Sequence, residues 1–257
     1  MDGVDGTLLE LAEEPGLWLP PEPSRDVVFA DGYCVVVYGR SVWVHRIRLA
    51  PDAVERAVEE VRTLLRSRSL DEVSWWVGER STPADLRERL EVLGLEPDDP
   101  PGMTTLAIAG RPAGEPSVEV RRVETLDDYL TALEIDWASF ELPEMEREER
   151  RVAARLAWPR IVADGTSTVY LAYIDGKPVG FGRAVFAPWA ALLLGGATVP
   201  EARGRGVYSS VVHARWQETI ERGVPRMVVS AGPMSAPILE RLGFRRLGQV
   251  RLLRDRL

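Results

Sequence analysis

Apolar residues in the first part of the chain follow two periods, one typical of strands and one typical of helices. Residues 41–49 (SVWVHRIRL) alternate between apolar and polar positions, which predicts a strand. Pro51 then opens a helical repeat of apolar residues at Val54, Ala57, Val58, Val61, Leu64 and Leu65. The block continues with a buried strand in VSWWVG, a helix in TPADLRERLEVLG that ends at Gly94, and a strand in MTTLAIA.

The same order of elements returns after a stretch rich in proline and glycine at residues 110–117 (GRPAGEPS), which we interpret as a linker. ALLLGGATV predicts a strand, Val207, Val211 and Ile220 mark a helix, RMVVS predicts a strand, and SAPILERLGF predicts a helix that ends at Gly243. This second block is longer, because residues 118–140 add a strand and a helix and EMEREERRVAARLAW adds another helix. Asp175-Gly176 predicts the turn of a hairpin in TVYLAYIDGKPVGFGRAVF.

Two landmarks indicate that the second block repeats the first. Pro51 and Pro200 are 149 residues apart, and so are Gly94 and Gly243. Around them APDA corresponds to VPEA, and ERLEVLGL corresponds to PILERLGF. We therefore predict an internal duplication, although strand-helix-strand-helix order is also common in unrelated α/β proteins.

Composition narrows the class of protein. A chain that is 45% hydrophobic and 28% charged is typical of soluble globular proteins, which argues against disordered and fibrous classes. The acidic amino terminus and the lack of a long apolar run favour neither a secretory signal nor a membrane span. Cys34 is the only cysteine, which fits a reducing compartment, so we expect a cytoplasmic protein.

The net charge and the small number of metal-ligating side chains argue against nucleic-acid binding and metal binding. The net charge of −8 argues against nonspecific nucleic-acid binding. With only two histidines and one cysteine, the chain has few ligands for zinc or copper, so we expect no metal site.

The most informative stretch is VPEARGRGVYSS, residues 199–210, between the strand ALLLGGATV and the following helix. The first amides of a helix lack partners within the helix and lie at the positive end of its dipole, so they can bind anions. Gly204 and Gly206 allow phosphate oxygens to approach the backbone, and Arg203 and Arg205 add positive charge. The spacing matches neither the P-loop nor the dinucleotide-binding fingerprint.

This stretch resembles the pyrophosphate loop of the GNAT superfamily of acyl-CoA N-acyltransferases. Val199, Pro200, Arg203, Gly204 and Gly206 fit the family pattern, whereas Tyr208 replaces the usual small residue, so that either its side chain points away or the pocket is remodelled. SAPILERLGF resembles the second helix on the cofactor side of that family. The resemblance implies an α/β fold with a mixed sheet, with a degenerate GNAT-like half-domain at 1–112 and a complete domain at 117–257.

The resemblance also implies acetyl-CoA as cofactor, bound where two parallel strands splay apart. The residues that it assigns to the cofactor are Ala197, Thr198, Val199, Arg203, Gly204, Arg205, Gly206, Val207, Tyr208 and Ser235. With the offset of 149, the loop corresponds to Val54, Glu55, Arg56 and Ala57, where a carboxylate replaces a glycine. We therefore predict that the first copy has lost the cofactor and has a structural role.

Acid and base assignments are harder. The family places a tyrosine where this chain has Leu239, so Ser235 is the remaining hydroxyl on that helix, either as a catalytic group or as the helix N-cap. As general base we favour Glu141 over Asp136 and Glu144, because ASFELPE breaks the helix and lets a carboxylate turn inward. His213 is expected to be packed or exposed. The large aromatic residues that either wall an acceptor pocket or belong to the core are Trp137, Phe140, Trp158 and Trp189.

The expected function is N-acetylation of a primary amine on a small molecule by direct attack on the thioester. A sensor or scaffold that binds CoA with little turnover, and transfer to a protein amine, stay open. The expected partners are a small-molecule amine, and neither nucleic acid nor membrane. A homodimer stays open, because the exposed sheet edges of a half-domain can pair within the chain or between chains.

Overall fold

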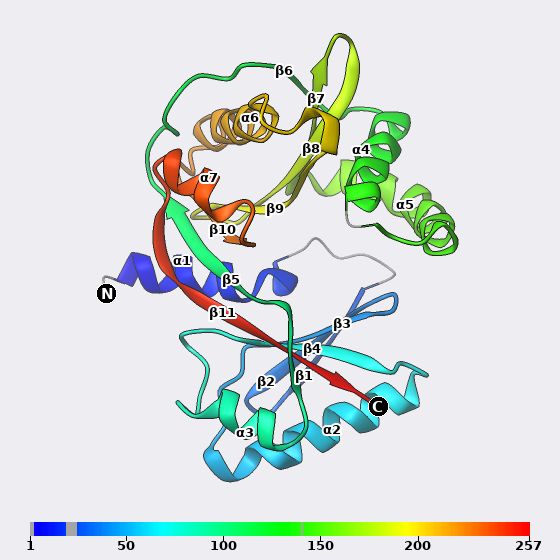
Figure 1. Ribbon diagram of the computed structural model, residues 1–257, viewed down its shortest axis with the longest axis vertical. Coiled ribbons are helices and arrows are strands. Elements are labelled where there is room, and N and C mark those ends of the chain that lie inside the picture. The colour runs from blue at the N-terminus through cyan, green and yellow to red at the C-terminus, as the bar shows by residue number, and fades with distance from the viewer. Residues whose placement is uncertain (1–2, 19–24, 140) are drawn as a thin grey trace. The chain divides into compact units, whose positions relative to one another are not determined.

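A computed structural model describes residues 3–18, 25–139 and 141–257. The chain forms two compact units (Figure 1). The first unit consists of Met1–Leu106, Ser230–Ala236 and Arg246–Leu257, and the second consists of Ala107–Val229 and Pro237–Arg245. The sequence boundaries 1–112 and 117–257 stay a prediction about the duplicated segments. Within the described residues, no helix is long and apolar enough to cross a membrane.

The first unit is built on a mixed sheet with the strand order β1-β2-β3-β4-β11-β5. Strands β1, β2 and β3 pair antiparallel, β3 and β4 pair parallel, and β4 and β11 pair antiparallel. The elements are α1 (Gly3–Glu13), η1 (Pro15–Leu17), β1 (Arg25–Ala30), β2 (Tyr33–Tyr38), β3 (Ser41–His45), η2 (Pro51–Ala53), α2 (Val54–Ser67), β4 (Glu72–Val77), α3 (Leu86–Val92), most of β5 (Glu96–Ile108) and most of β11 (Arg245–Arg256).

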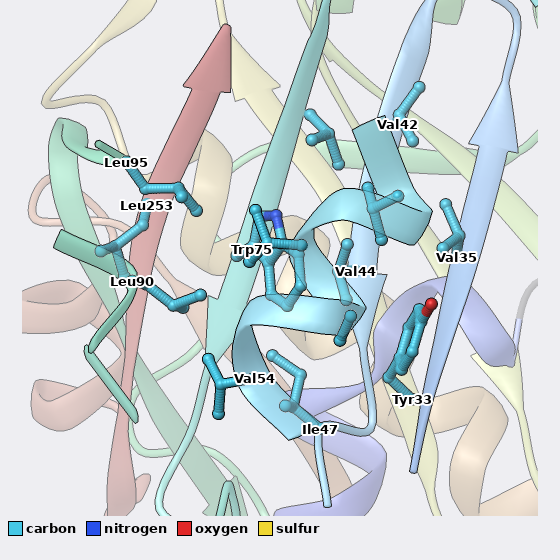
Figure 2. Packing of buried hydrophobic residues seen from close by; sticks show 14 of the residues in the cluster. Tyr33, Val35, Val42, Val44, Ile47, Val54, Trp75, Leu90, Leu95 and Leu253 are labelled. Carbon is cyan, nitrogen blue, oxygen red and sulfur yellow. The ribbon is translucent and has the colours of Figure 1, made fainter. Parts of the chain in front are cut away.

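The core of this unit lies between one face of the sheet and helices α2 and α3. Trp75 of β4 is fully buried and lies beside Val44 of β3 (Figure 2). The apolar face predicted for α2 packs on these strands, with Val54, Ala57, Val58, Val61 and Leu65 buried and Leu64 partly buried. The predicted helix and its buried face are therefore confirmed.

The second unit contains the strands in the order β10-β9-β8-β7-β6. Strands β6 to β9 pair antiparallel, and β9 and β10 pair parallel. The elements are β6 (Glu119–Arg122), α4 (Leu126–Ser139), α5 (Glu144–Asp164), β7 (Ser167–Ile174), β8 (Lys177–Phe186), β9 (Ala191–Thr198), η3 (Pro200–Ala202), α6 (Val207–Glu221), most of β10 (Met227–Ala231) and most of α7 (Ala236–Arg241).

Helices cover both faces of this sheet. Apolar residues of α4 and α5 pack on one face with Val169, Leu171, Phe181 and Ala197. On the other face, residues of α6 pack with Tyr170 and Ala172 of β7. The predicted turn between β7 and β8 is confirmed, since Asp175 and Gly176 both have positive φ, as a tight hairpin requires.

The structure supports the duplication at both landmarks. Pro51 and Pro200 each open a short 3₁₀ helix, and Gly94 and Gly243 end a helix with φ of +93° and +96°. The alignment by a constant offset is wrong in one detail. Helix α2 begins at Val54, directly after η2, whereas residues 203–206 separate η3 from α6. The first copy therefore lacks the loop altogether.

Candidate active site

The loop of residues 203–206 turns the chain from η3 into α6. Gly204 and Gly206 have φ of +75° and +77°, a region that residues with a Cβ rarely adopt. No atom lies within 4 Å of a Cβ built at Gly204, so this side of the loop is open. Both glycines therefore set the path of the backbone, and Gly204 leaves its surface bare as predicted, whereas Gly206 faces the Ser117 side chain where a Cβ would lie.

The amides of this loop are available to a ligand. The first hydrogen bond into α6 is from the Ser210 amide to the Gly206 carbonyl oxygen, at 2.9 Å. The N–H groups of Gly204, Arg205, Gly206 and Val207 donate to no other described residue. They also lie at the positive end of α6, where amides of this kind are suited to binding an anion.

Two serines fix the loop from its inner side. The Ser210 hydroxyl accepts hydrogen bonds from the amides of Ser117 and Val118, at 2.9 and 3.3 Å, and lies 2.9 Å from the Gly206 carbonyl oxygen, to which it donates. The Ser117 hydroxyl donates to the Arg205 carbonyl oxygen at 3.2 Å. Loop carbonyls are thus bound by the protein, while the amides are not. Sequence reasoning missed the contacts of both serines, because Ser117 is the last residue of the predicted linker and Ser210 lies outside the residues that fit the family pattern.

The arginines of the loop supply charge at the surface. Arg203 and Arg205 are both exposed. The Arg203 Nε donates to the Thr198 carbonyl oxygen at 3.3 Å, so this side chain folds back over the end of β9. A phosphate at the loop amides would lie among positive charges.

The side chain of Tyr208 is directed toward the sheet. A Cβ built on Gly196 of β9 would lie 3.1 Å from Cε2 of Tyr208, so the ring packs where Gly196 has no side chain. The Arg215 Cζ lies 6.0 Å from the centre of the same ring. The structure therefore favours the alternative in which the Tyr208 side chain points away from the loop. Tyr208 does not cover the amides of residues 204–207.

Strand β9 leaves β10 soon after pairing with it. The parallel register is limited to Met227↔Ala191 and Val228↔Leu192. Beyond this point β9 contains a bulge, since Gly182 pairs with Gly196 while Arg183 pairs with Leu194, so that Gly195 is the extra residue. The predicted splay of the two strands is present.

Of the residues predicted to align the cofactor at the edge of β9, Ala197, Thr198 and Val199, only Thr198 directs its amide to the open edge. The Val199 amide donates to the Val179 carbonyl oxygen at 2.9 Å, so it is not available to a ligand. Neighbouring residues of a strand direct their amides to opposite edges, so Gly196 and Thr198 present theirs on the β10 side. Ala197 directs its buried side chain into the core beside α4.

On the α4 face, Asp136 is the carboxylate best suited to exchange protons. Its side chain is half-buried, and burial raises the pKa of the carboxyl to about 6, against the opposing charges of Arg183 and Arg150. Arg183 Nη2 also donates to the Tyr129 hydroxyl at 3.1 Å. A carboxylate with such a pKa can accept a proton near neutral pH.

The other predicted bases lie at the surface. Glu141 follows α4 in a turn with a φ of +53° and is exposed, so its carboxylate does not turn inward as expected. Glu144 is exposed and forms an ion pair with Arg151 at 2.8 Å. A helix break near a carboxylate was thus a weaker indicator than its place on a packed helix face.

The remaining candidates are mostly structural. Ser235 precedes α7 and its hydroxyl donates to the Gly232 carbonyl oxygen at 3.3 Å. Leu239 is fully buried, and His213 is buried on α6. Trp137 is buried in the core, Trp158 stacks on Tyr129 with ring centres 5.2 Å apart, and Trp189 is partly buried. Phe140 lies outside the described residues.

Comparison with known proteins finds a family model that matches part of the chain. A model described as the acetyltransferase (GNAT) family matches residues 129–244, a range that contains the loop and the open edge of β9. This segment of the chain is similar to the GNAT family of acetyltransferases. None of the curated proteins with which the sequence was compared matches it.

Solved GNAT structures share the fold of the chain. A GCN5-related N-acetyltransferase from Kribbella flavida has a TM-score of 0.72 at 18% identity, covering 99% of this chain and 96% of that one. A tandem GNAT protein from the clavulanic acid biosynthesis pathway has a TM-score of 0.63 at 16% identity, with 99% and 95% covered. A GCN5-related N-acetyltransferase from Sphaerobacter thermophilus has a TM-score of 0.63 at 17% identity, with 88% and 76% covered. At these identities the likeness concerns the fold, and it agrees with a tandem GNAT form.

Proposed function

We propose that this protein is a cytoplasmic N-acetyltransferase that transfers the acetyl group of acetyl-CoA to the primary amine of a small molecule. The observation that carries the proposal is the set of bare amides at Gly204, Arg205, Gly206 and Val207, next to the open edge of β9. Acetyl-CoA has a diphosphate to occupy the first feature and an amide-containing arm to pair with the second. It supplies the activated acetyl group as a thioester.

The residues present fit this cofactor at both features. The amides of residues 204–207 would bind the diphosphate, with Arg203 and Arg205 neutralising its charge. Gly196 and Thr198 would pair with the arm of the cofactor in the manner of an added strand. Val199 keeps its place in the loop pattern, but its amide is bound within the protein.

One cofactor for each chain is supported by the contrast between the copies. In the first unit, β3 and β4 also pair parallel at only two positions, Trp43↔Ser74 and Val44↔Trp75. Beyond that point the Thr82 amide donates to the Ile47 carbonyl oxygen at 3.1 Å, and the Leu49 amide donates to the Thr82 carbonyl oxygen at 3.2 Å. The strand edge that is open in β9 is therefore closed here by the chain itself.

Helix α1 fills the same region of the first unit. The Glu13 carboxylate accepts a hydrogen bond from the Glu79 amide at 2.6 Å, just after β4. Gly78 has no Cβ where this carboxylate lies. These contacts occupy the Glu79 amide at that place, which fits a structural role.

Asp136 is our candidate for the general base. It would take the proton of the attacking ammonium, because a carboxylate with a pKa near 6 is ionised at neutral pH and still basic. Glu141 stays a prediction with less support, since its side chain is exposed. We assign no general acid, since Leu239 offers no hydroxyl and Ser235 donates to the Gly232 carbonyl oxygen.

A CoA-binding sensor with little turnover is the second candidate, favoured by the buried Leu239. Single-turnover transfer from [14C]acetyl-CoA to a library of primary amines and amine-bearing peptides separates the two. An N-acetyltransferase labels at least one small amine well above the rate of the Asp136→Asn variant. Tight binding of acetyl-CoA with no labelled acceptor would favour the sensor, and labelling of peptides alone would favour a protein substrate.

A further inference from the structure

Helix α6 carries an arginine in the interior of the second unit. Arg215 lies two turns after Tyr208 and is only 1% exposed, which makes it the largest fully buried side chain of this unit. Its Nε donates to the Val211 carbonyl oxygen of the same helix at 3.3 Å. Gly182 makes room for the guanidinium, since a Cβ there would lie 3.1 Å from the Arg215 Cζ.

The guanidinium bridges the two strands at the bulge. Nη1 of Arg215 donates to the Arg183 carbonyl oxygen of β8 at 3.2 Å and to the Gly195 carbonyl oxygen of β9 at 3.3 Å. Gly195 is the extra residue of the bulge and has a φ of +66°. The regular hydrogen-bond ladder between β8 and β9 is interrupted at the bulge. The arginine connects the two strands there by donating to a carbonyl oxygen of each.

Arg215 is poorly compensated as a buried charge. Burial lowers the pKa of the guanidinium, while Tyr208, which also hydrogen-bonds to it, and Tyr170 favour its charged form. The nearest acid on the helix, Glu218, is bound by Thr168, Tyr170 and Arg222. Nη2 of Arg215 has no hydrogen-bond partner among the described residues. A buried charge that no carboxylate compensates opposes folding, so stability alone does not explain this residue.

We infer that Arg215 is a positioning residue for acetyl transfer: it locks the Gly195 bulge of β9 so that the Gly196 amide stays directed at the open strand edge, where the thioester carbonyl of acetyl-CoA would accept its hydrogen bond. The inference rests on the proposed function. The bulge reverses the direction of the amides that follow it, so its geometry decides which amide meets the thioester. The ring of Tyr208 packs on Gly196 and so supports the residue that follows the bulge.

The test compares Arg215→Met, which keeps the length of the side chain without its donors, with Arg215→Lys and with the control Arg222→Met. Arg222 lies on the same helix and pairs with Glu218, away from the bulge. For each protein we would measure the melting temperature, the affinity for acetyl-CoA, and the 13C chemical shift of bound [1-13C]acetyl-CoA. The shift reports the hydrogen bond to the thioester carbonyl and does not depend on the acceptor.

We expect Arg215→Met to keep its affinity for acetyl-CoA and to lose the polarisation of the thioester carbonyl. Arg215→Met should melt no lower than the wild type and bind acetyl-CoA within about threefold, since the diphosphate loop is intact. Its carbonyl shift should return to the value of free acetyl-CoA, and where an acceptor is known kcat should fall on the order of 100-fold. Arg222→Met should keep the wild-type shift.

Three outcomes would overturn the inference or its basis. A wild-type carbonyl shift in folded Arg215→Met would show that the arginine does not position the amide. Failure of both Arg215→Met and Arg215→Lys to fold would assign the side chain to stability. No binding of acetyl-CoA to the wild type would refute the proposed function itself, which is a distinct result from the other two.

Discussion

Arg62 of α2 grips Asp255 of β11 through two parallel hydrogen bonds, Nε to Oδ2 and Nη2 to Oδ1, each 2.9 Å long. The two residues are 193 positions apart in the sequence. Asp255 is 1% exposed, and β11 pairs with β4 along Arg251–Arg256. The last strand of the chain is therefore an integral part of the first unit.

Asp255→Asn should destabilise the protein by about 3 kcal/mol, because it removes the buried counter-charge of Arg62 and leaves the guanidinium with only the exposed Glu59. Urea unfolding measures this change. The matched control is Asp71→Asn, whose partner Arg40 and own carboxylate are 65% and 76% exposed, and it should change the stability by less than about 0.5 kcal/mol. Equal effects of the two variants would contradict the role of the Arg62–Asp255 pair.

The diphosphate loop is best tested at Gly204. Gly204→Asp and Gly204→Asn are matched in size, and both residues tolerate positive φ better than other side chains do. The aspartate adds a negative charge beside the loop amides, so it should weaken CoA binding by at least about tenfold relative to the asparagine. Calorimetry measures both affinities. Similar affinities would place the diphosphate elsewhere.

Gly206 is a less suitable position for such a test. A Cβ on Gly206 would lie 3.3 Å from the Ser117 Cβ and closer still to the Ser117 hydroxyl. A substitution there would disturb the packing of the segment that follows the linker. A loss of CoA binding would then have two explanations.

Asp136 predicts the acid side of the pH profile. The raised pKa means that the carboxyl is protonated below about pH 6 and cannot act as a base there. The rate of acetyl transfer should therefore rise as the pH increases through about 6. Asp136→Asn should lower kcat on the order of 100-fold and abolish this limb, while Glu144→Gln leaves it in place. An unchanged limb in Asp136→Asn would exclude Asp136 as the base.

Glu14 predicts a pH-dependent term in the stability of the first unit. Burial raises the pKa of its carboxyl to about 7, although Arg48 lies 3.3 Å away. The folded-state pKa of Glu14 exceeds the unfolded value of 4.5, so the protonated carboxyl favours the folded state. Its contribution to the stability is complete below pH 4.5 and is lost as the pH rises through 7. Glu14→Gln should thus gain melting temperature relative to the wild type between pH 5 and 8. A constant difference over this range would contradict the prediction.

Much of the fold follows from local chemistry. Gly94 and Gly243 end helices because only glycine adopts a φ near +90° without strain, and Asp175 and Gly176 form a hairpin turn because aspartate and glycine both tolerate positive φ. Pro51 and Pro200 mark the same point in both copies, because proline fits the first turn of a helix. Each signal acts within a few residues and is therefore readable from sequence.

The site depends on relations that no short stretch contains. Arg215 has the spacing of a helix residue, and a charged residue in a helix is usually solvated, so its burial against Gly182 and Gly195 could not be foreseen. Asp136 is preferred over Glu141 because its carboxylate lies near Arg183 of β8. Tertiary packing decides this proximity. The bulge at Gly195 depends in the same way on the register of β8 against β9.

The most direct measurement is an NMR titration of 15N-labelled protein with CoA, followed through the amide signals of Gly204, Arg205, Gly206 and Val207. These four signals should shift downfield with CoA and with 3′-phospho-ADP, which carries the diphosphate, and should not move with pantetheine, with saturation at one ligand for each chain. Signals that stay in place while CoA binds, or that move equally with pantetheine, would show that the loop does not grip the diphosphate and would contradict the assignment of the active site.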